Sequence, residues 1–152
     1  MDKLDFRILD ELQRECRLSS QALAERVGLS ASPCWRRVKK LENMGAIQAN
    51  VAILNPSVIG LQVTALANVN LENHQPNSIA DFNKVVQSRP EILECWVTSG
   101  EHDFILKIVC ESISTYDELL NKHIMQCRAV HQVNSSIVLR STKHTTALPL
   151  PL

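Results

Sequence analysis

Residues 61–140 alternate between strand and helix patterns, and the order of these patterns constrains the fold more than any other feature. In residues 61–72 apolar side chains occupy every second position, which is typical of a half-buried strand. The later elements are expected as a helix between residues 75 and 90, strands at 92–98 and 104–110, a helix from Ser114 and a strand at 132–140. The order strand-helix-strand-strand-helix-strand predicts a ferredoxin-like antiparallel sheet with both helices on one face.

The first 45 residues have a helical periodicity instead. Three short amphipathic helices are expected at residues 4–15, 19–28 and 32–45. Ser19 is the predicted N-cap of the second helix, and Gly28 is a natural stop. Ser32 and Pro33 are interpreted as the N-cap and first residue of the third helix. Three helices with a glycine-containing turn between the second and third are typical of a helix-turn-helix.

Between these two regions, residues 46–54 are rich in β-branched side chains and predict a strand or a wing-like hairpin. The expected fold class is therefore α+β, a winged helix-turn-helix followed by a βαββαβ domain. We expect a boundary at residue 54, with a helix-turn-helix domain and strand linker over 1–54 and a ferredoxin-like domain over 55–152. The 152-residue length suits two small domains.

The charges are unevenly distributed, although 16 Lys and Arg balance 16 Asp and Glu over the whole chain. Residues 17–40 hold six cations against Glu25 alone. The cations are Arg17, Arg26, Arg36, Arg37, Lys39 and Lys40. A short basic segment on a neutral protein suggests one localised contact with a polyanion.

The third helix carries the last four of these cations. At about 100° per residue, they fall on one side of the helix, and the apolar residues Cys34, Val38 and Leu41 fall on the other. A solvated charged face would look the same in isolation. As the third helix after a glycine-containing turn, however, it is placed to enter the major groove of DNA. There Arg reads guanine edges and Lys neutralises phosphate.

Several features exclude other classes of protein. No apolar run is long enough to span a membrane, and the charged N-terminus does not resemble a signal peptide, so we expect a cytoplasmic protein. The five cysteines lack a Cys-x-x-Cys pair and are expected to be free thiols. His123, Cys127 and His131 are spaced four apart, but their helix is expected to end near Gln126, so no metal site is expected. No catalytic motif occurs, and we expect neither an enzyme nor a cofactor.

Three stretches resemble a known family. The helix-turn-helix segment LAERVGLSASPCWRRVKKLE at residues 23–42, with Gly45-Ala46-Ile47 beyond it, looks like the DNA-binding half of the Lrp/AsnC regulators. The segment TSGEHDF at residues 98–104 stands where that family has its Thr-Gly-x-x-Asp-aromatic loop. KHTTALPL at 143–150 resembles the C-terminal ending of a bacterial branch. The resemblance covers nearly the whole chain.

The resemblance implies a transcription regulator that dimerises through its second domain and assembles further into tetramers or octamers. An effector, typically an amino acid, would bind at the glycine-containing loop and tune DNA binding or assembly. The residues expected to contact DNA are Ser30, Ser32, Trp35, Arg36, Arg37, Lys39 and Lys40. The residues expected to contact the effector are Thr98, Ser99, Gly100, Glu101, His102 and Asp103, with Ser135 and Ser136 on the last strand.

Within the loop, Gly100 could adopt a positive φ and expose its N–H to a carboxylate, and Asp103 could accept from an ammonium group. An ordinary hairpin turn would use the same residues. The chain departs from the family at Ser99 and His102, and again at residues 128–131, where a Pro-Gly-Val-like turn is expected. Two alternatives to an effector-responsive regulator stay open. One is an architectural DNA-binding protein without an effector, and the other is a ferredoxin-like metabolite-binding protein or small enzyme.

Overall fold

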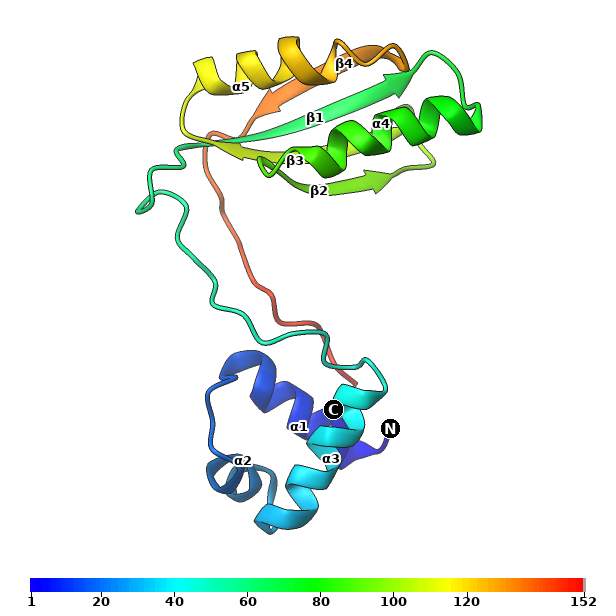
Figure 1. Ribbon diagram of the computed structural model, residues 1–152. Helices are drawn as coiled ribbons and strands as arrows, with labels where there is room; N and C mark the ends of the chain where they lie inside the picture. The colour runs from blue at the N-terminus through cyan, green and yellow to red at the C-terminus, as the bar shows by residue number, and fades with distance from the viewer. Residues whose placement is uncertain (152) are drawn as a thin grey trace. The chain divides into compact units, whose positions relative to one another are not determined.

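A computed structural model describes residues 1–151, which divide into two compact units (Figure 1). The helical unit comprises Met1–Ile53 and the C-terminal segment from Thr142 onward, and the sheet unit comprises Leu54–Ser141. The expected second domain, 55–152, thus includes a segment that the structure groups with the first unit. The chain leaves the sheet unit after its last strand and packs again with the helices at its beginning.

The helical unit contains three helices, α1 (Lys3–Arg14), α2 (Ser20–Val27) and α3 (Ala31–Asn43). As predicted, Ser19 caps α2, accepting from the Ala22 N–H, and Gly28 ends it in the left-handed conformation at φ 74°. Helix α3 begins earlier than predicted, with Ser30 rather than Ser32 as N-cap. Pro33 therefore lies in the first turn, where its missing N–H is still tolerated because these groups have no intrahelical partner.

One face of each helix packs into a shared core. Its fully buried members are Ile8, Leu23, Ala24, Val27, Cys34 and Leu41. Two of these, Cys34 and Leu41, come from the predicted apolar side of α3. This packing leaves the other side of α3 toward solvent.

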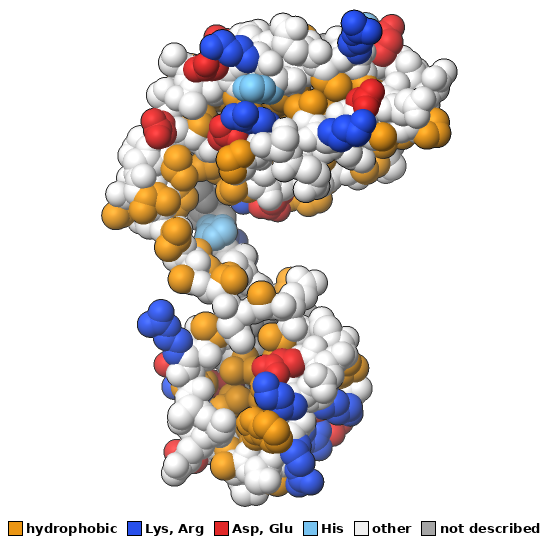
Figure 2. Space-filling view, in the orientation of Figure 1, with side chains coloured by type: hydrophobic (Ala, Val, Ile, Leu, Met, Phe, Trp, Pro, Cys, Tyr) orange, Lys and Arg blue, Asp and Glu red, His pale blue; other side chains and the backbone are white. Residues whose placement is uncertain are grey.

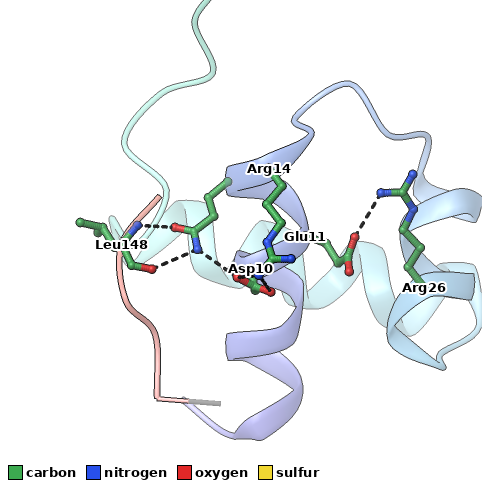
Figure 3. Close-up of polar contacts among 6 residues, drawn as sticks. Asp10, Glu11, Arg14, Arg26 and Leu148 are labelled. Carbon is green, nitrogen blue, oxygen red and sulfur yellow. Dashed lines mark hydrogen bonds and ion pairs between the residues drawn. The ribbon is translucent and has the colours of Figure 1, made fainter. Parts of the chain in front are cut away.

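Gln13 of α1 contacts the C-terminal segment at Leu148 (Figure 3). The Gln13 amide donates to the Leu148 carbonyl at 3.1 Å and accepts from the Leu148 N–H at 2.8 Å. A second donation at 3.1 Å to Asp10 fixes the orientation of the amide. A single side chain thus holds both polar groups of one backbone residue in the segment.

The wing predicted at residues 46–54 is not present, and no strand forms between residues 46 and 62. Val51, Ile53 and Leu54 are instead 65–70% exposed. A strand is stable only when its backbone pairs with a neighbour and one face is covered. The β-branched composition favoured a strand, but the chain supplies no partner for it here.

The sheet unit follows the predicted order of elements. They are β1 (Val63–Leu71), α4 (Pro76–Ser88), β2 (Ile92–Val97), β3 (Phe104–Cys110), α5 (Ile113–Leu119), a π-helical turn (Leu120–Ile124) and β4 (Val130–Ile137). The strands are all antiparallel and lie in the order β2-β3-β1-β4. This topology confirms the ferredoxin-like, α+β prediction. Helix α5 is capped by Ser112, which accepts from the Thr115 N–H, and not by Ser114 as expected.

Helices α4 and α5 cover one face of the sheet (Figure 1). The odd-numbered positions of β1 and the even-numbered positions of β3 point into this core. There the ring centroids of Phe82 of α4 and Phe104 lie 4.7 Å apart, with the ring planes tilted by 51°. The alternate positions form the open face of the sheet. Leu66 and Trp96 lie there and are 37% and 44% exposed. No helix in the described residues is long and apolar enough to cross a membrane.

Candidate functional site

Helix α3 presents a basic surface on the side away from its core (Figure 2). Arg36 and Lys40 are exposed, and Lys39 is exposed but pairs with Glu42 of the same helix at 2.7 Å. Trp35 lies beside them with 51% of its surface exposed. An aromatic ring between cations offers an apolar contact next to the groups that bind phosphate.

The two serines predicted to contact DNA lie at the beginning of the same helix. Ser30 and Ser32 are both exposed, and the N-cap Ser30 makes no side-chain capping bond. A free hydroxyl and unsatisfied N–H groups at a helix N-terminus are suited to a phosphate oxygen. Ser30, Ser32, Trp35, Arg36, Lys39 and Lys40 thus lie along one helix and are accessible together.

Arg37 is the exception among the predicted DNA contacts. Its Nη1 donates to Asp2 at 2.8 Å and to Asp5 at 2.6 Å, and only 30% of its side chain is exposed. The hydrogen bonds that the guanidinium donates to Asp5 and Asp2 raise its pKa. Burial would raise the pKa of Asp5, but the Asp2 N–H and the Arg37 guanidinium hold it below its ordinary value. Arg37 is therefore directed toward α1 in this structure.

In the sheet unit, the loop between β2 and β3 forms a closed turn. The Thr98 N–H donates to the Asp103 carbonyl at 3.0 Å, and the Thr98 hydroxyl donates to the His102 carbonyl. The Asp103 N–H donates in turn to the Val69 carbonyl at 3.1 Å, which fixes the loop to β1. The loop tip, Ser99, Gly100 and Glu101, is exposed.

The Asp103 carboxylate joins this loop to the end of β1 and to the connection after it. Its Oδ2 accepts from the Leu71 N–H at 2.8 Å, and its Oδ1 lies 2.7 Å from His74 Nε2. The Leu71 N–H, followed by His74, lowers the pKa of this carboxyl. The carboxylate is consequently ionised, structurally fixed and 26% exposed. These properties suit recognition of a cationic group.

Two partners of the loop were missed by sequence analysis. His74 lies in the connection after β1, and Asn70 lies on β1, where its Oδ1 meets His102 Nδ1 at 3.3 Å and the Asp103 N–H at 3.2 Å. Neither residue belongs to a local motif. Only the register of β1 against β3, with Val69 opposite Phe104, brings them to the loop.

Gly100 does not have the positive φ that the sequence analysis considered for it. Positive φ values occur at Gly28, Gly45 and Gly60 but not at Gly100. A Cβ placed on Gly100 would meet no heavy atom within 4 Å. The glycine therefore leaves open space above the loop backbone and does not serve a left-handed turn.

The two serines of β4 are separated from the loop. Ser135 and Ser136 pair with Ala67 and Leu66 in the middle of β1, whereas the loop contacts β1 at Val69 and Leu71. Ser135 Oγ also forms a hydrogen bond with the Tyr116 hydroxyl of α5. The structure brings Thr98–Asp103 together and leaves Ser135 and Ser136 apart from them.

His123, Cys127 and His131, which are spaced four apart in the sequence, do not form a cluster in the structure. Within residues 1–151, no group of three His, Cys, Asp or Glu side chains is arranged to hold a metal ion. His131 Nδ1 lies 2.8 Å from Glu72 instead. That contact joins β4 to the end of β1.

Comparison with known proteins relates both units to one family. Residues 1–48 match the winged helix-turn-helix DNA-binding family, and residues 64–148 match the Lrp/AsnC ligand binding domain. The chain is 37% identical over 150 residues to the DNA-binding transcriptional activator DecR of Escherichia coli K12, covering 99% of both chains. It is 35% identical over 151 residues to the glutamate uptake regulatory protein of Zymomonas mobilis, covering 99% of this chain and 92% of the relative.

Among solved structures, a transcriptional regulator from Neisseria meningitidis in complex with L-Met superposes with a TM-score of 0.96. The two chains share 35% identity, over 99% of this chain and 97% of that one. Likeness at this level, in both sequence and fold, extends over the whole described molecule. The chain belongs to the Lrp/AsnC family of transcriptional regulators.

Proposed function

We propose that this protein is a sequence-specific DNA-binding transcriptional regulator, and not an enzyme, that acts in the cytoplasm. We propose also that a small effector, an amino acid, modulates its DNA binding or its assembly. The observation that carries the first part is the division of α3 into a buried apolar side and an exposed basic side. The relatives named for glutamate uptake and bound to L-Met support an amino acid as the effector.

On the helical unit, α3 is the proposed recognition helix. Arg36 lies in the middle of the exposed side and is suited to bidentate contact with guanine O6 and N7. Lys39 and Lys40 would neutralise phosphates, with Ser30 and Ser32 as donors at the helix start and Trp35 as an apolar contact. Glu42, which now pairs with Lys39, would have to release it.

On the sheet unit, the loop over Thr98–Asp103 is the proposed effector site. A free amino acid carries an ammonium and a carboxylate at fixed separation. The ionised Asp103 suits the ammonium, and the exposed residues at the loop tip, Ser99–Glu101, would offer backbone N–H groups to the carboxylate. Ser135 and Ser136 remain weaker candidates because the register places them away from the loop.

The open face of the sheet is the proposed surface for self-assembly. It exposes Leu66 and Trp96, and neither α4 nor α5 covers it. A symmetric dimer would present two copies of α3 to half-sites one helical turn of DNA apart, or a multiple of that distance.

DNA selection from a random duplex pool, followed by salt titration, tests this function. Lys40→Ala should weaken binding to all sequences and reduce the slope of log K against log salt by about one. Arg36→Ala should cost about 1–3 kcal/mol and relax specificity at one base pair. Lys84→Ala, which removes an exposed cation from the sheet unit, is the control. Binding unchanged in both α3 variants would contradict the proposal.

A further inference from the structure

We infer that Arg37 is a positioning residue, which fixes the recognition helix against α1, and is not itself a DNA contact. The inference rests on the proposed function of α3. It assigns this cation of the basic segment to a different task from Arg36 and Lys40. The argument begins at the N-terminus of α1.

The N-terminus of α1 is closed by a reciprocal capping box. Asp2 Oδ1 accepts from the Asp5 N–H at 2.9 Å, and Asp5 Oδ2 accepts from the Asp2 N–H at 3.0 Å. Each carboxylate thereby uses one of its two oxygens. One oxygen on each remains free.

One nitrogen of Arg37 donates to both of the remaining carboxylate oxygens. Its Nη1 lies 2.8 Å from Asp2 Oδ2 and 2.6 Å from Asp5 Oδ1. Asp5 is 1% exposed, and it is the one buried charged side chain among residues 1–151. Such a carboxylate requires a charged partner, because an unpaired buried charge is strongly destabilising. The geometry leaves Arg37 as that partner.

The place of Arg37 on α3 agrees with this role. At about 100° per residue, it lies about 100° from Arg36 and only about 40° from the buried Leu41. Arg37 is therefore on the boundary between the basic side and the core. From there its side chain reaches α1, while Arg36 and Lys40 face solvent.

This contact fixes how α3 is held. The cap of α1 and the middle of α3 are separated by more than thirty residues in sequence, yet three side chains join them through charge-assisted bonds. A rotation of α3 about its axis would break these bonds before it broke the apolar packing. Because base contacts depend on the direction of Arg36, the Arg37 contact governs DNA affinity indirectly.

The test uses the full-length protein, the DNA duplex obtained by selection, and a salt titration. Arg37→Gln should weaken binding about tenfold or more, the scale of one misplaced base contact. It should nevertheless leave the slope of log K against log salt unchanged, because no phosphate contact is lost. Lys40→Ala provides the comparison, with a slope reduced by about one.

Asp5→Asn separates positioning from general electrostatics. Removing a negative charge from a DNA-binding domain should by itself tighten binding. The positioning role predicts the reverse, a weakening in the same direction as Arg37→Gln. Glu25→Gln removes an exposed acid from α2 and serves as the matched control, with binding equal to or tighter than that of the parent.

Thermal unfolding of each variant, with binding measured well below its midpoint, keeps loss of fold separate from loss of positioning. If Arg37→Gln does not fold, Asp2→Asn replaces it, because Asn preserves the cap and removes only the charge. A reduced salt slope in Arg37→Gln, or tighter binding in Asp5→Asn, would overturn the positioning role. Unchanged binding in Arg36→Ala and Lys40→Ala would instead overturn the proposed role of α3.

Discussion

His74 Nε2 lies 2.7 Å from Asp103 Oδ1, so a side chain from the connection after β1 occupies the oxygen that an effector ammonium would use. The imidazole is 67% exposed and the carboxylate 26% exposed. An incoming amino acid must displace this contact or add to it. The cost of breaking the contact between His74 and Asp103 would therefore reduce the affinity of the proposed site for its effector.

Replacing His74 tests that competition. His74→Ala should bind the effector about two- to fivefold more tightly, because an exposed pair of this kind contributes up to about 1 kcal/mol and no longer has to be broken. Titration calorimetry measures the change. His131→Ala, which removes an exposed histidine paired with Glu72, is the control. Weaker binding in His74→Ala would mean that the imidazole contacts the effector itself.

The lowered pKa of Asp103 predicts how stability depends on pH. Because the folded protein holds this pKa below its ordinary value, the ionised carboxyl adds stability at neutral pH. That contribution should fade as pH falls below about 4 and be absent once pH has passed below the folded pKa. Asp103→Asn should therefore lose about 1 kcal/mol at pH 7 and converge with the parent in acid.

Urea unfolding of the parent and variant from pH 7 to pH 3 checks this dependence. Asp81→Asn is the control, since Asp81 pairs with Lys84 on the surface of α4 and should matter by less than about 0.5 kcal/mol. A difference between Asp103→Asn and the parent that stays constant through acid would contradict the assigned role of the charge.

The hydrogen bond between Tyr116 and Ser135 predicts that this serine stabilises the fold and does not contact the effector. Burial raises the pKa of Tyr116, and its hydroxyl bonds to Ser135 Oγ. Tyr116→Phe and Ser135→Ala should each cost about 1 kcal/mol, and the double variant should cost less than their sum. Ser135→Ala should leave effector affinity unchanged. A loss of effector affinity with additive stabilities would return Ser135 to the effector site.

The Gln13 contact predicts protection of one backbone amide. The Leu148 N–H donates to Gln13 Oε1, so Gln13→Ala should accelerate hydrogen exchange at Leu148 while lowering global stability by less than about 1 kcal/mol. Gln21→Ala on α2, whose amide contacts only Glu25, should leave that exchange rate unchanged. Equal exchange in the parent and Gln13→Ala would show that the amide does not hold the segment.

Much of this architecture was predictable because local signals agreed with one another. Ser19 begins α2 through its hydroxyl and Gly28 ends it through a left-handed backbone, and the alternation in residues 61–72 located β1 to within two residues. The fold of the sheet unit followed from the order of its elements. Two N-caps were displaced by two residues, to Ser30 and Ser112, because the sequence places another serine, Ser32 or Ser114, two residues further on.

The features that sequence analysis did not find concern contacts between residues distant in sequence. The ion pairs of Arg37 could not be predicted because a helical projection shows charge but not the aspartates that α1 brings to it. His74 was overlooked because only strand register places it beside Asp103. The wing was predicted from β-branched composition, which cannot reveal whether a pairing partner exists.

The most direct test of the account is the DNA affinity of the purified protein measured against each of the twenty amino acids. The account predicts that one or a few of them change the affinity about 5- to 150-fold, the range of ordinary allosteric coupling. Asp103→Ala should keep the ligand-free affinity and lose the response. Specific DNA binding that no amino acid alters would contradict the effector role and favour an architectural protein.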